Sequence, residues 1–335
     1  MVAKIGINGF GRIGRQILRV IMEQYKNDLE VVSINDGGNI ETNAHLFKYD
    51  STYGTYNGNV SHHDNVLEID GQKIIKTSDR NPSNLDWSKY EVDIVVESTG
   101  NLTDRESAST HLTNGAKTVL ITAPASNADL TMVLGVNEHE YDPEIHHVIS
   151  NASCTTNCAA PLVKVLHDNF GINQGLMTTV HSYTNDQKVL DGNHKDLRRA
   201  RTAAGNIIPT STGAAKTCTV VIPELQGKIH GVALRVPTQT VSVIDFVATL
   251  DKKVTPEEIN KAYKNAADTT MSGILDYCNE PLVSSDFRGS PYSCIIDSLS
   301  TMVLGNSMVK VLGWYDNEWG YSCRTVEMLK FIANK

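Results

Sequence analysis

The chain lacks the sequence features of several protein classes. Its 335 residues include only six cysteines, at positions 154, 158, 218, 278, 294 and 323, and none of them forms a C-x-x-C pair. This distribution matches neither a zinc site nor a disulfide framework, and scattered thiols are typical of a reducing cytoplasm. No apolar run approaches the ~20 residues that a membrane-spanning helix needs. We therefore expect no metal, no membrane association and a cytoplasmic location.

The sequence also lacks an excess of positive charge. Its net charge of −8 at pH 7 argues against a general binder of nucleic acid or of anionic membranes, although local arginines could still bind small phosphates. An apolar strand begins almost at the first residue, so we expect no signal or transit peptide. A length of 335 residues exceeds one ordinary hydrophobic core and predicts two domains.

Strands and helices alternate over the first 150 residues. An apolar run at 4–8 leads into a glycine-rich turn and a helical run at 15–25, and a second strand is predicted at 30–36. Further strands are predicted at 93–97 and 118–122, with a helical run at 106–112 between them. This order is typical of an α/β domain, and it predicts a Rossmann-type doubly wound parallel sheet over residues 1–150.

The pattern changes after about residue 150. Longer strand-like runs are found at 176–182, 228–236, 240–251, 294–304 and 308–314, and a helical run lies at 256–267. Apolar and polar residues alternate clearly over 240–247, which is typical of a strand with one buried face. We expect an α+β catalytic domain over 151–319, with a mixed, mostly antiparallel sheet that carries helices on one face. A final helix is predicted at 320–335.

The glycine-rich turn has the spacing of a dinucleotide fingerprint. Gly9, Gly11 and Gly14 follow a strand and open a helix, which is the context in which backbone N–H groups hold a pyrophosphate. Asp36 ends the next predicted strand, where a carboxylate can accept a hydrogen bond from the adenosine ribose. A glycine-rich turn without a ligand is the alternative.

Residues 150–158, S-N-A-S-C-T-T-N-C, place Cys154 where an apolar strand gives way to a helix. The helix N-terminus should lower the pKa of a thiol there and favour the nucleophilic thiolate, and its N–H groups could hold an oxyanion. A small buried cysteine is the alternative. His181 ends an apolar strand run and is a candidate imidazole partner, although distance along the sequence does not decide between this role and a structural one.

Several arginines suggest phosphate binding. Arg198, Arg199 and Arg201 are clustered, and Arg235 lies inside an apolar strand, where a buried charge needs a partner. The segment 211–216, S-T-G-A-A-K, is rich in hydroxyl groups and small residues. Together these elements suggest a pocket with more than one phosphate subsite. An exposed, salt-bridged face is the alternative for the cluster at 198–201.

Five segments, at 8–15, 150–158, 176–181, 211–216 and 314–318, resemble the phosphorylating glyceraldehyde-3-phosphate dehydrogenase family, in order and over essentially the whole chain. The resemblance implies NAD(P)-dependent oxidative phosphorylation of D-glyceraldehyde 3-phosphate to 1,3-bisphosphoglycerate through a cysteine thioester. It also implies a homotetramer and a C-terminal helix, 320–335, that packs on the cofactor domain.

The same resemblance implies roles for individual residues. Cys154 matches the nucleophile and His181 the base. Besides the fingerprint residues Gly9 and Gly11, the positions that match cofactor contacts are Arg12, Ile13, Asp36, Arg80, Thr122 and Asn317. The positions that match contacts to the substrate's phosphate and to inorganic phosphate are Ser153, Thr155, Thr184, Arg199, Thr212, Gly213 and Arg235.

The choice of cofactor is less clear from the sequence. Asp36 favours NAD because a carboxylate repels a 2′-phosphate, yet small residues follow it at 37–39. Strictly NAD-using members of the family typically carry a bulky apolar residue and a proline where this chain has Gly192 and Asn193. We expect that NAD works and that NADP is also accepted. An erythrose-4-phosphate dehydrogenase and a non-catalytic dinucleotide- or RNA-binding regulator remain as alternatives.

Overall fold

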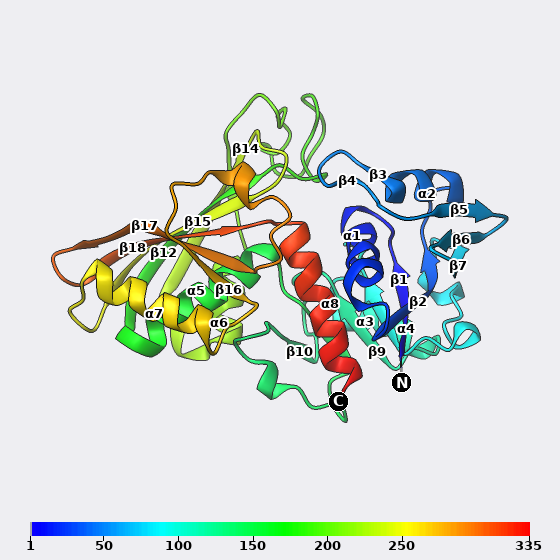
Figure 1. Ribbon diagram of the computed structural model, residues 1–335, viewed down its shortest axis with the longest axis horizontal. Coiled ribbons are helices and arrows are strands. Elements are labelled where there is room, and N and C mark those ends of the chain that lie inside the picture. The colour runs from blue at the N-terminus through cyan, green and yellow to red at the C-terminus, as the bar shows by residue number, and fades with distance from the viewer. Residues whose placement is uncertain (1) are drawn as a thin grey trace. The chain divides into compact units, whose positions relative to one another are not determined.

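The computed structural model describes residues 2–335 and divides them into two compact units. The first unit comprises residues 2–132, 139–152 and 325–335, and the second comprises residues 133–138 and 153–324 (Figure 1). The chain therefore passes between the units several times, and each unit contains one large sheet.

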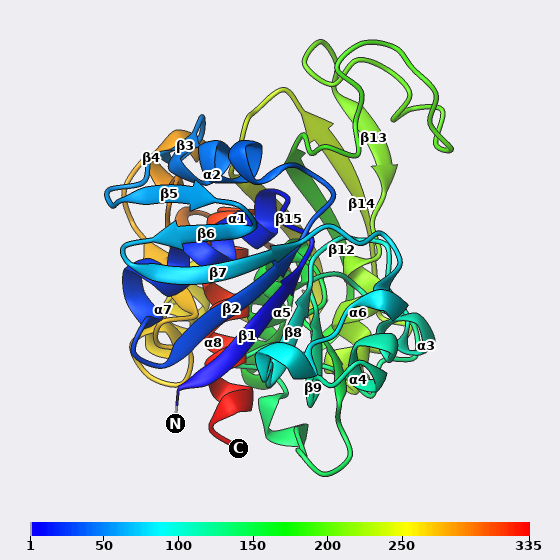
Figure 2. The ribbon, with the colours of Figure 1, turned by 90° about the vertical axis from the view of Figure 1, so that its right-hand side faces the viewer.

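The first unit contains a nine-stranded sheet in the order β10-β11-β9-β8-β1-β2-β7-β6-β5. Its strands are β1 (Ala3–Asn8), β2 (Leu29–Asn35), β5 (Val60–His63), β6 (Val66–Ile69), β7 (Gln72–Thr77), β8 (Ile94–Glu97), β9 (Thr118–Ile121), β10 (Leu130–Thr131) and β11 (Val148–Ser150). All pairs from β10 to β7 are parallel, whereas β5, β6 and β7 are antiparallel neighbours. Figure 2 shows the strands from β9 to β5. The predicted Rossmann-type sheet is confirmed.

The first helix begins at the glycine-rich turn. Gly9 has a φ of +96°, and a Cβ atom on Gly14 would lie 2.2 Å from the carbonyl oxygen of Gly9, so neither position accepts a side chain without strain. The helix α1 (Arg12–Val20) starts three residues before the predicted 15–25 and continues as a π-helix over Ile21–Tyr25. The helical periodicity predicted one continuous helix, because it gives no signal for a wider turn.

The other elements of the first unit are short. They are α2 (Ile40–Lys48), the two-stranded hairpin β3 (Tyr49–Asp50) and β4 (Gly54–Thr55), α3 (Arg105–Ala108) and α4 (Thr110–Thr113). The side chain of Asn39 caps α2 by accepting a hydrogen bond from the backbone N–H of Thr42. The predicted helix at 106–112 is thus two single turns that meet at Ser109.

The last part of α8 (Trp319–Ala333) belongs to the first unit from Thr325 onward. Lys330 pairs with Asp28 at 3.0 Å, and the side chain of Asn151 donates to the hydroxyl group of Thr325 at 2.9 Å. These contacts hold the end of the chain against the segments that follow α1 and β11.

The second unit contains a seven-stranded sheet in the order β13-β14-β12-β15-β18-β17-β16. Its strands are β12 (Ile172–Ser182), β13 (Ile208–Ser211), β14 (Ile229–Val236), β15 (Ser242–Leu250), β16 (Leu275–Cys278), β17 (Cys294–Leu304) and β18 (Met308–Tyr315). The pairs β12/β14 and β16/β17 are parallel and the other four are antiparallel. The predicted mixed, mostly antiparallel sheet is confirmed.

Three helices, α5 (Cys154–Phe170), α6 (Ala214–Val221) and α7 (Pro256–Asp268), pack against this sheet. The helix α5 approaches β18 closely at Gly313, where a Cβ atom would lie 2.8 Å from Cδ1 of Leu162 and 2.9 Å from Sγ of Cys294. The thiol of Cys158 also donates to the carbonyl oxygen of Gly313 at 3.6 Å. The absence of a side chain at this position permits the close approach.

Large apolar side chains are exposed on the strands of the second sheet. They include Leu176 of β12, Val232 of β14 and Met308 of β18, with exposed fractions of 68%, 48% and 43%. Alternate residues of β15 and β18 are buried, so each strand has one enclosed face. Among residues 2–335, no helix combines the length and apolar character that crossing a membrane requires.

Candidate active site

Cys154 and His181 meet in the second unit. Cys154 is half-buried at the first position of α5, where Ser153 caps the helix by accepting a hydrogen bond from the backbone N–H of Thr156 at 3.0 Å. His181 lies near the end of β12 and is 3% exposed. The Sγ atom of Cys154 is 3.5 Å from Nε2 of His181. The fold thus brings together two residues that are 27 positions apart in the sequence.

The other ring nitrogen of His181 has two polar neighbours. Nδ1 lies 2.7 Å from the carbonyl oxygen of Ser182, which can only accept a hydrogen bond. Nη1 of Arg235, which can only donate, contacts the same nitrogen. In the tautomer that carries its proton on Nδ1, Nε2 presents its lone pair to the sulfur of Cys154. This is the orientation that a base needs in order to accept the thiol proton.

Both groups are uncharged at neutral pH. Burial, and secondly the charge of Arg235, lower the pKa of His181 to about 3. Burial raises the pKa of Cys154, although the charge of Arg235 and hydrogen bonds with Thr155 oppose that effect. The sequence-based expectation of a lowered pKa for Cys154 is therefore wrong, because the enclosure of the helix end by protein outweighs the local positive potential. The pair is a neutral thiol beside a neutral imidazole.

Arg235 lies beside His181 on the neighbouring strand β14, in direct register with it. Its Nη1 atom contacts Nδ1 of His181 and donates to the carbonyl oxygen of Ser182 at 3.1 Å. Its Nε atom is buried and has no hydrogen-bond partner within the described residues 2–335. An unpartnered buried donor next to a reactive pair is suited to an anionic oxygen of a ligand.

Arg199 is anchored to the strand that leads into the hydroxyl-rich loop. Its guanidinium group pairs with Asp186, donates from Nε to the hydroxyl group of Thr210 at 2.9 Å and contacts the carbonyl oxygen of Ser211 at 3.3 Å. The loop follows directly, and Thr212 accepts a hydrogen bond there from the backbone N–H of Ala214 at 3.2 Å.

Gly213 is the residue before α6 and is exposed. The other clustered arginines, Arg198 and Arg201, are also exposed, and Arg201 forms an exposed ion pair with Asp191. Of the arginine cluster, Arg199 alone is tied to the strand that leads into the loop of Thr212 and Gly213.

The remaining predicted residues of this unit are also held by polar contacts. The hydroxyl group of Thr155 is 2.9 Å from that of Tyr315, which is also 2.8 Å from the hydroxyl group of Thr179. The backbone N–H of Thr184 donates to the side chain of Gln187 at 3.1 Å. Asn317 accepts hydrogen bonds from Ser182 and Ser242, at 2.8 and 3.0 Å. Tyr315 was not among the predicted site residues, although it lies in the segment 314–318 that carries the family resemblance.

The first unit contains a cavity of about 360 Å³ at the carboxyl ends of its central strands. It is lined by Asn8, Gly9, Asn35, Asp36, Gly37, Asp79, Arg80, Pro82, Thr99, Asn101 and Leu102. A Cβ atom on Gly11, at the start of α1, would meet nothing within 4 Å. An open space at the N-terminus of a helix, beside a strand end that carries a carboxylate, fits a dinucleotide.

Asp36 is held in its ionised form at the edge of this cavity. Its Oδ1 atom accepts hydrogen bonds from the backbone of Gly38 and the side chain of Asn43, at 2.8 and 3.1 Å, and Oδ2 accepts one from Phe10 at 3.1 Å. Burial raises the pKa of Asp36, but these hydrogen bonds and the charge of Lys76 together outweigh it, so the net pKa is lowered. The carboxylate keeps capacity to accept a further hydrogen bond at Oδ2.

The other predicted cofactor residues differ in their surroundings. Arg80 is exposed and lines the cavity. Arg12 pairs with Asp50 at 2.6 Å, and Ile13 is half-buried in the first turn of α1. Thr122, after β9, donates to the carbonyl oxygen of Glu97 at 3.1 Å.

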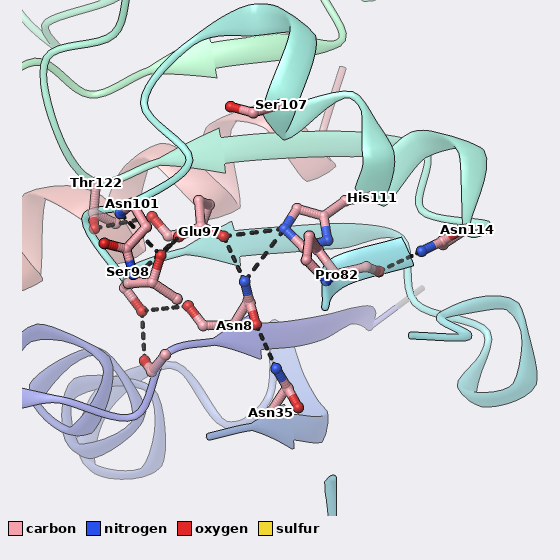
Figure 3. A network of polar contacts seen from close by, with 12 residues as sticks. Asn8, Asn35, Pro82, Glu97, Ser98, Asn101, Ser107, His111, Asn114 and Thr122 are labelled. Carbon is pink, nitrogen blue, oxygen red and sulfur yellow. Dashed lines mark hydrogen bonds and ion pairs between the residues drawn. The ribbon is translucent and has the colours of Figure 1, made fainter. Parts of the chain in front are cut away.

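A buried polar network supports Asn8 and Thr99, two of the residues that line the cavity (Figure 3). Glu97 accepts hydrogen bonds from Asn8 at 2.6 Å, from Nε2 of His111 at 3.0 Å and from the backbone of Thr99 at 2.9 Å. The indole N–H of Trp87 donates to Nδ1 of His111 at 3.0 Å. No motif in the sequence predicted this network, although a glutamate at the end of an apolar strand run was a usable signal.

Comparisons with known proteins agree with this geometry. Residues 3–105 match the family model "Glyceraldehyde 3-phosphate dehydrogenase, NAD binding domain", and residues 153–317 match "Glyceraldehyde 3-phosphate dehydrogenase, C-terminal domain". A glyceraldehyde-3-phosphate dehydrogenase of Geobacillus stearothermophilus is 58% identical over 335 residues, which is 100% of this chain and 99% of the relative. The chain belongs to the glyceraldehyde-3-phosphate dehydrogenase family.

Two further members of the family have similar identities. Glyceraldehyde-3-phosphate dehydrogenase 2 of Trichormus variabilis is 54% identical over 333 residues, covering 99% of both chains. Glyceraldehyde-3-phosphate dehydrogenase 2 of Bacillus subtilis is 53% identical over 333 residues, covering 99% of this chain and 97% of the relative. As a member of this family, the chain is an oxidoreductase that uses NAD and acts on glyceraldehyde 3-phosphate. The described residues 2–335 contain no cluster of three or more metal-ligating side chains.

Proposed function

We propose that this family member oxidises glyceraldehyde 3-phosphate through a covalent thioester on Cys154, with His181 as the base and inorganic phosphate as the final acceptor. The observation that carries the proposal is the 3.5 Å contact between Sγ of Cys154 and Nε2 of His181. Within this scheme, residues 1–150 with the helix 320–335 bind the dinucleotide, and residues 151–319 carry out the covalent chemistry.

The proposed first step is a proton transfer within a neutral pair. The thiol of Cys154 gives its proton to Nε2 of His181 as the sulfur adds to the aldehyde carbon, and the adduct is a hemithioacetal. The protonated ring can donate that proton to the new oxygen, and the backbone N–H groups at the start of α5 stabilise negative charge there. The hydrogen bond from Nδ1 to Ser182 holds the ring in place throughout.

Oxidation and phosphorolysis follow at the same sulfur. NAD, when bound, supplies the acceptor for the hydride that leaves the hemithioacetal carbon. His181 takes the hydroxyl proton in that step, so the product is a thioester on Cys154. Phosphate then attacks the thioester carbon to form the acyl phosphate, and His181 returns its proton to the departing sulfur. Cys154 and His181 thereby return to their uncharged forms.

Phosphate groups are proposed to bind to the hydroxyl and guanidinium groups near this pair. The unpartnered Nε of Arg235 supports one anionic contact, and the anchored guanidinium of Arg199 beside the loop of Thr212 and Gly213 supports another. Ser153, Thr155 and Thr184 complete the proposed set. Asp36, Arg80 and the turn from Gly9 to Ile13 are proposed to hold the dinucleotide, together with Thr122 and Asn317.

We extend the proposal to NADP, to assembly and to location. The small residues after Asp36, and Gly192 with Asn193, support acceptance of NADP as well as NAD. The exposed apolar side chains of Leu176, Val232 and Met308 support a homotetramer, because such a surface favours association between copies. Scattered free thiols support a cytoplasmic location.

The direct test is the replacement of Cys154 by serine, with Cys218→Ser as the matched control. We expect Cys154→Ser to abolish aldehyde oxidation while it leaves NAD binding within about twofold, because only the thiolate can form the thioester. Turnover of the wild-type protein should also depend on inorganic phosphate. Substantial oxidation by Cys154→Ser would exclude the covalent route, and phosphate-independent turnover would favour the erythrose-4-phosphate alternative.

A further inference from the structure

The buried ammonium group of Lys76 contacts the backbone of Asp36. Lys76, near the end of β7, is 8% exposed and is in register with Ile34 of β2. Its Nζ atom donates to the backbone oxygens of Asp36 at 3.0 Å and of Thr77 at 3.3 Å, and it also contacts the hydroxyl group of Ser78. The three N–H bonds of the ammonium are therefore all used, and the group is fixed in place.

No carboxylate among residues 2–335 pairs with Lys76 within 4.0 Å. A buried cation without such a partner acts on its surroundings mainly through its field. Burial lowers the pKa of Lys76, and the charge of Asp36 opposes this effect only in part. The charge of Lys76 in turn helps to lower the pKa of Asp36. The two charges are thus coupled across the backbone of the Asp36 turn.

The net charge around the cavity that Asp36 lines determines whether a phosphate on the adenosine ribose is attracted or repelled there. Asp36 and Asp79 contribute negative charge to its lining, and Arg80 contributes positive charge. Without Lys76 the group would be net negative and would repel a phosphate on the adenosine ribose. With Lys76 the four charges balance, and the exposed guanidinium of Arg80 is free to approach an anion.

We propose that Lys76 is a specificity-determining residue, whose fixed charge offsets that of Asp36 and allows the cavity to accept an adenosine with a 2′-phosphate. The inference rests on the proposed acceptance of NADP and deepens it. Lys76 does not touch the ligand in this scheme, because its hydrogen bonds are already made. It acts by cancelling the repulsion that a lone carboxylate at position 36 would exert.

The test compares charge with structure at position 76. Lys76→Gln removes the charge, Lys76→Arg retains it, and Lys73→Gln removes an exposed charge from the same strand as a control. Binding of adenosine 2′,5′-bisphosphate and of 5′-AMP is measured by calorimetry. We expect Lys76→Gln to weaken the bisphosphate about tenfold more than 5′-AMP, as for two charges within ~10 Å. Lys76→Arg should retain most of the preference, and Lys73→Gln should not change it.

The kinetic counterpart is the ratio of kcat/KM for NADP to that for NAD, which should fall about tenfold in Lys76→Gln. The difference should shrink at high ionic strength, because it is electrostatic. Equal weakening of both adenosine ligands would show a purely structural role, and no weakening of either would show no role; each result would overturn the proposal. Failure of the proposed NADP use is distinguishable, because the wild-type protein itself would then neither bind the bisphosphate nor turn over NADP.

Discussion

The environment of His181 leads to a prediction about stability that is independent of catalysis. Burial, and secondly the charge of Arg235, lower its pKa from 6.5 to about 3. Between these two values, the unfolded chain binds one more proton at this residue than the folded chain does. The free energy of unfolding therefore falls as the pH falls through this window, and rises with pH up to about 6.5.

The size of the effect follows from the two pKa values. A group with a pKa of 6.5 in the unfolded chain and about 3 in the folded chain should cost about 2 kcal/mol of stability on going from pH 7.5 to pH 5. In His181→Asn this contribution is absent, so the variant should lose about 2 kcal/mol less than the wild type over the same interval. Contributions that are common to both proteins cancel in the difference.

The measurement is urea-induced unfolding at pH 7.5 and pH 5.0, at one protein concentration because association also contributes to stability. His63→Asn, which removes an exposed imidazole on β5, is the matched control and should follow the wild type. Arg235→Gln should lose nearly as much as the wild type, because burial is the larger cause of the lowered pKa of His181 and remains when the neighbouring charge is removed. If the wild type and His181→Asn lose the same stability between the two pH values, the imidazole is not held neutral by its surroundings.

Two other predictions concern the dinucleotide. Gly14→Ala should weaken NAD binding by more than about tenfold, because its Cβ atom would lie 2.2 Å from the oxygen of Gly9, and calorimetry with NAD checks this; wild-type affinity would show that the turn can relax without cost. The double variant Gly192→Leu with Asn193→Pro should depress kcat/KM for NADP by about tenfold relative to NAD in steady-state kinetics, and an unchanged ratio would remove this loop from the account of cofactor choice.

Much of the fold follows from local patterns in the sequence. Strict alternation over 240–247 predicted β15, and the glycine fingerprint predicted the turn from β1 into α1. The hairpin of β6 and β7 was missed even though it carries an Asp-Gly turn at 70–71 with positive φ at both residues, which is a strong hairpin signal. The π-helical end of α1 has no sequence signature of this kind.

The candidate site was predictable in its residues more than in its electrostatics. Cys154 and His181 could be named from their flanking residues, and the fold brings them together. The pKa of Cys154 could not be inferred, because it depends on how closely other segments enclose the start of α5. Lys76 and Glu97 were missed for a related reason. Their significance arises from strand pairing that places them beside Asp36 and Asn8, and no motif records such pairings.

The missing side chain at Gly313 has a consequence for the precision of the chemistry. Cys154 lies one helical turn before Cys158, and Cys158 is the residue that touches the backbone of β18 at Gly313. Any displacement of α5 away from the sheet would be passed along the helix to the sulfur atom. A misplacement of about 1 Å can cost on the order of a hundredfold in rate. The precision of the contact between Cys154 and His181 therefore depends on packing in the hydrophobic core. It depends on Gly313 in particular, because the absence of a Cβ atom there lets α5 pack closely against β18.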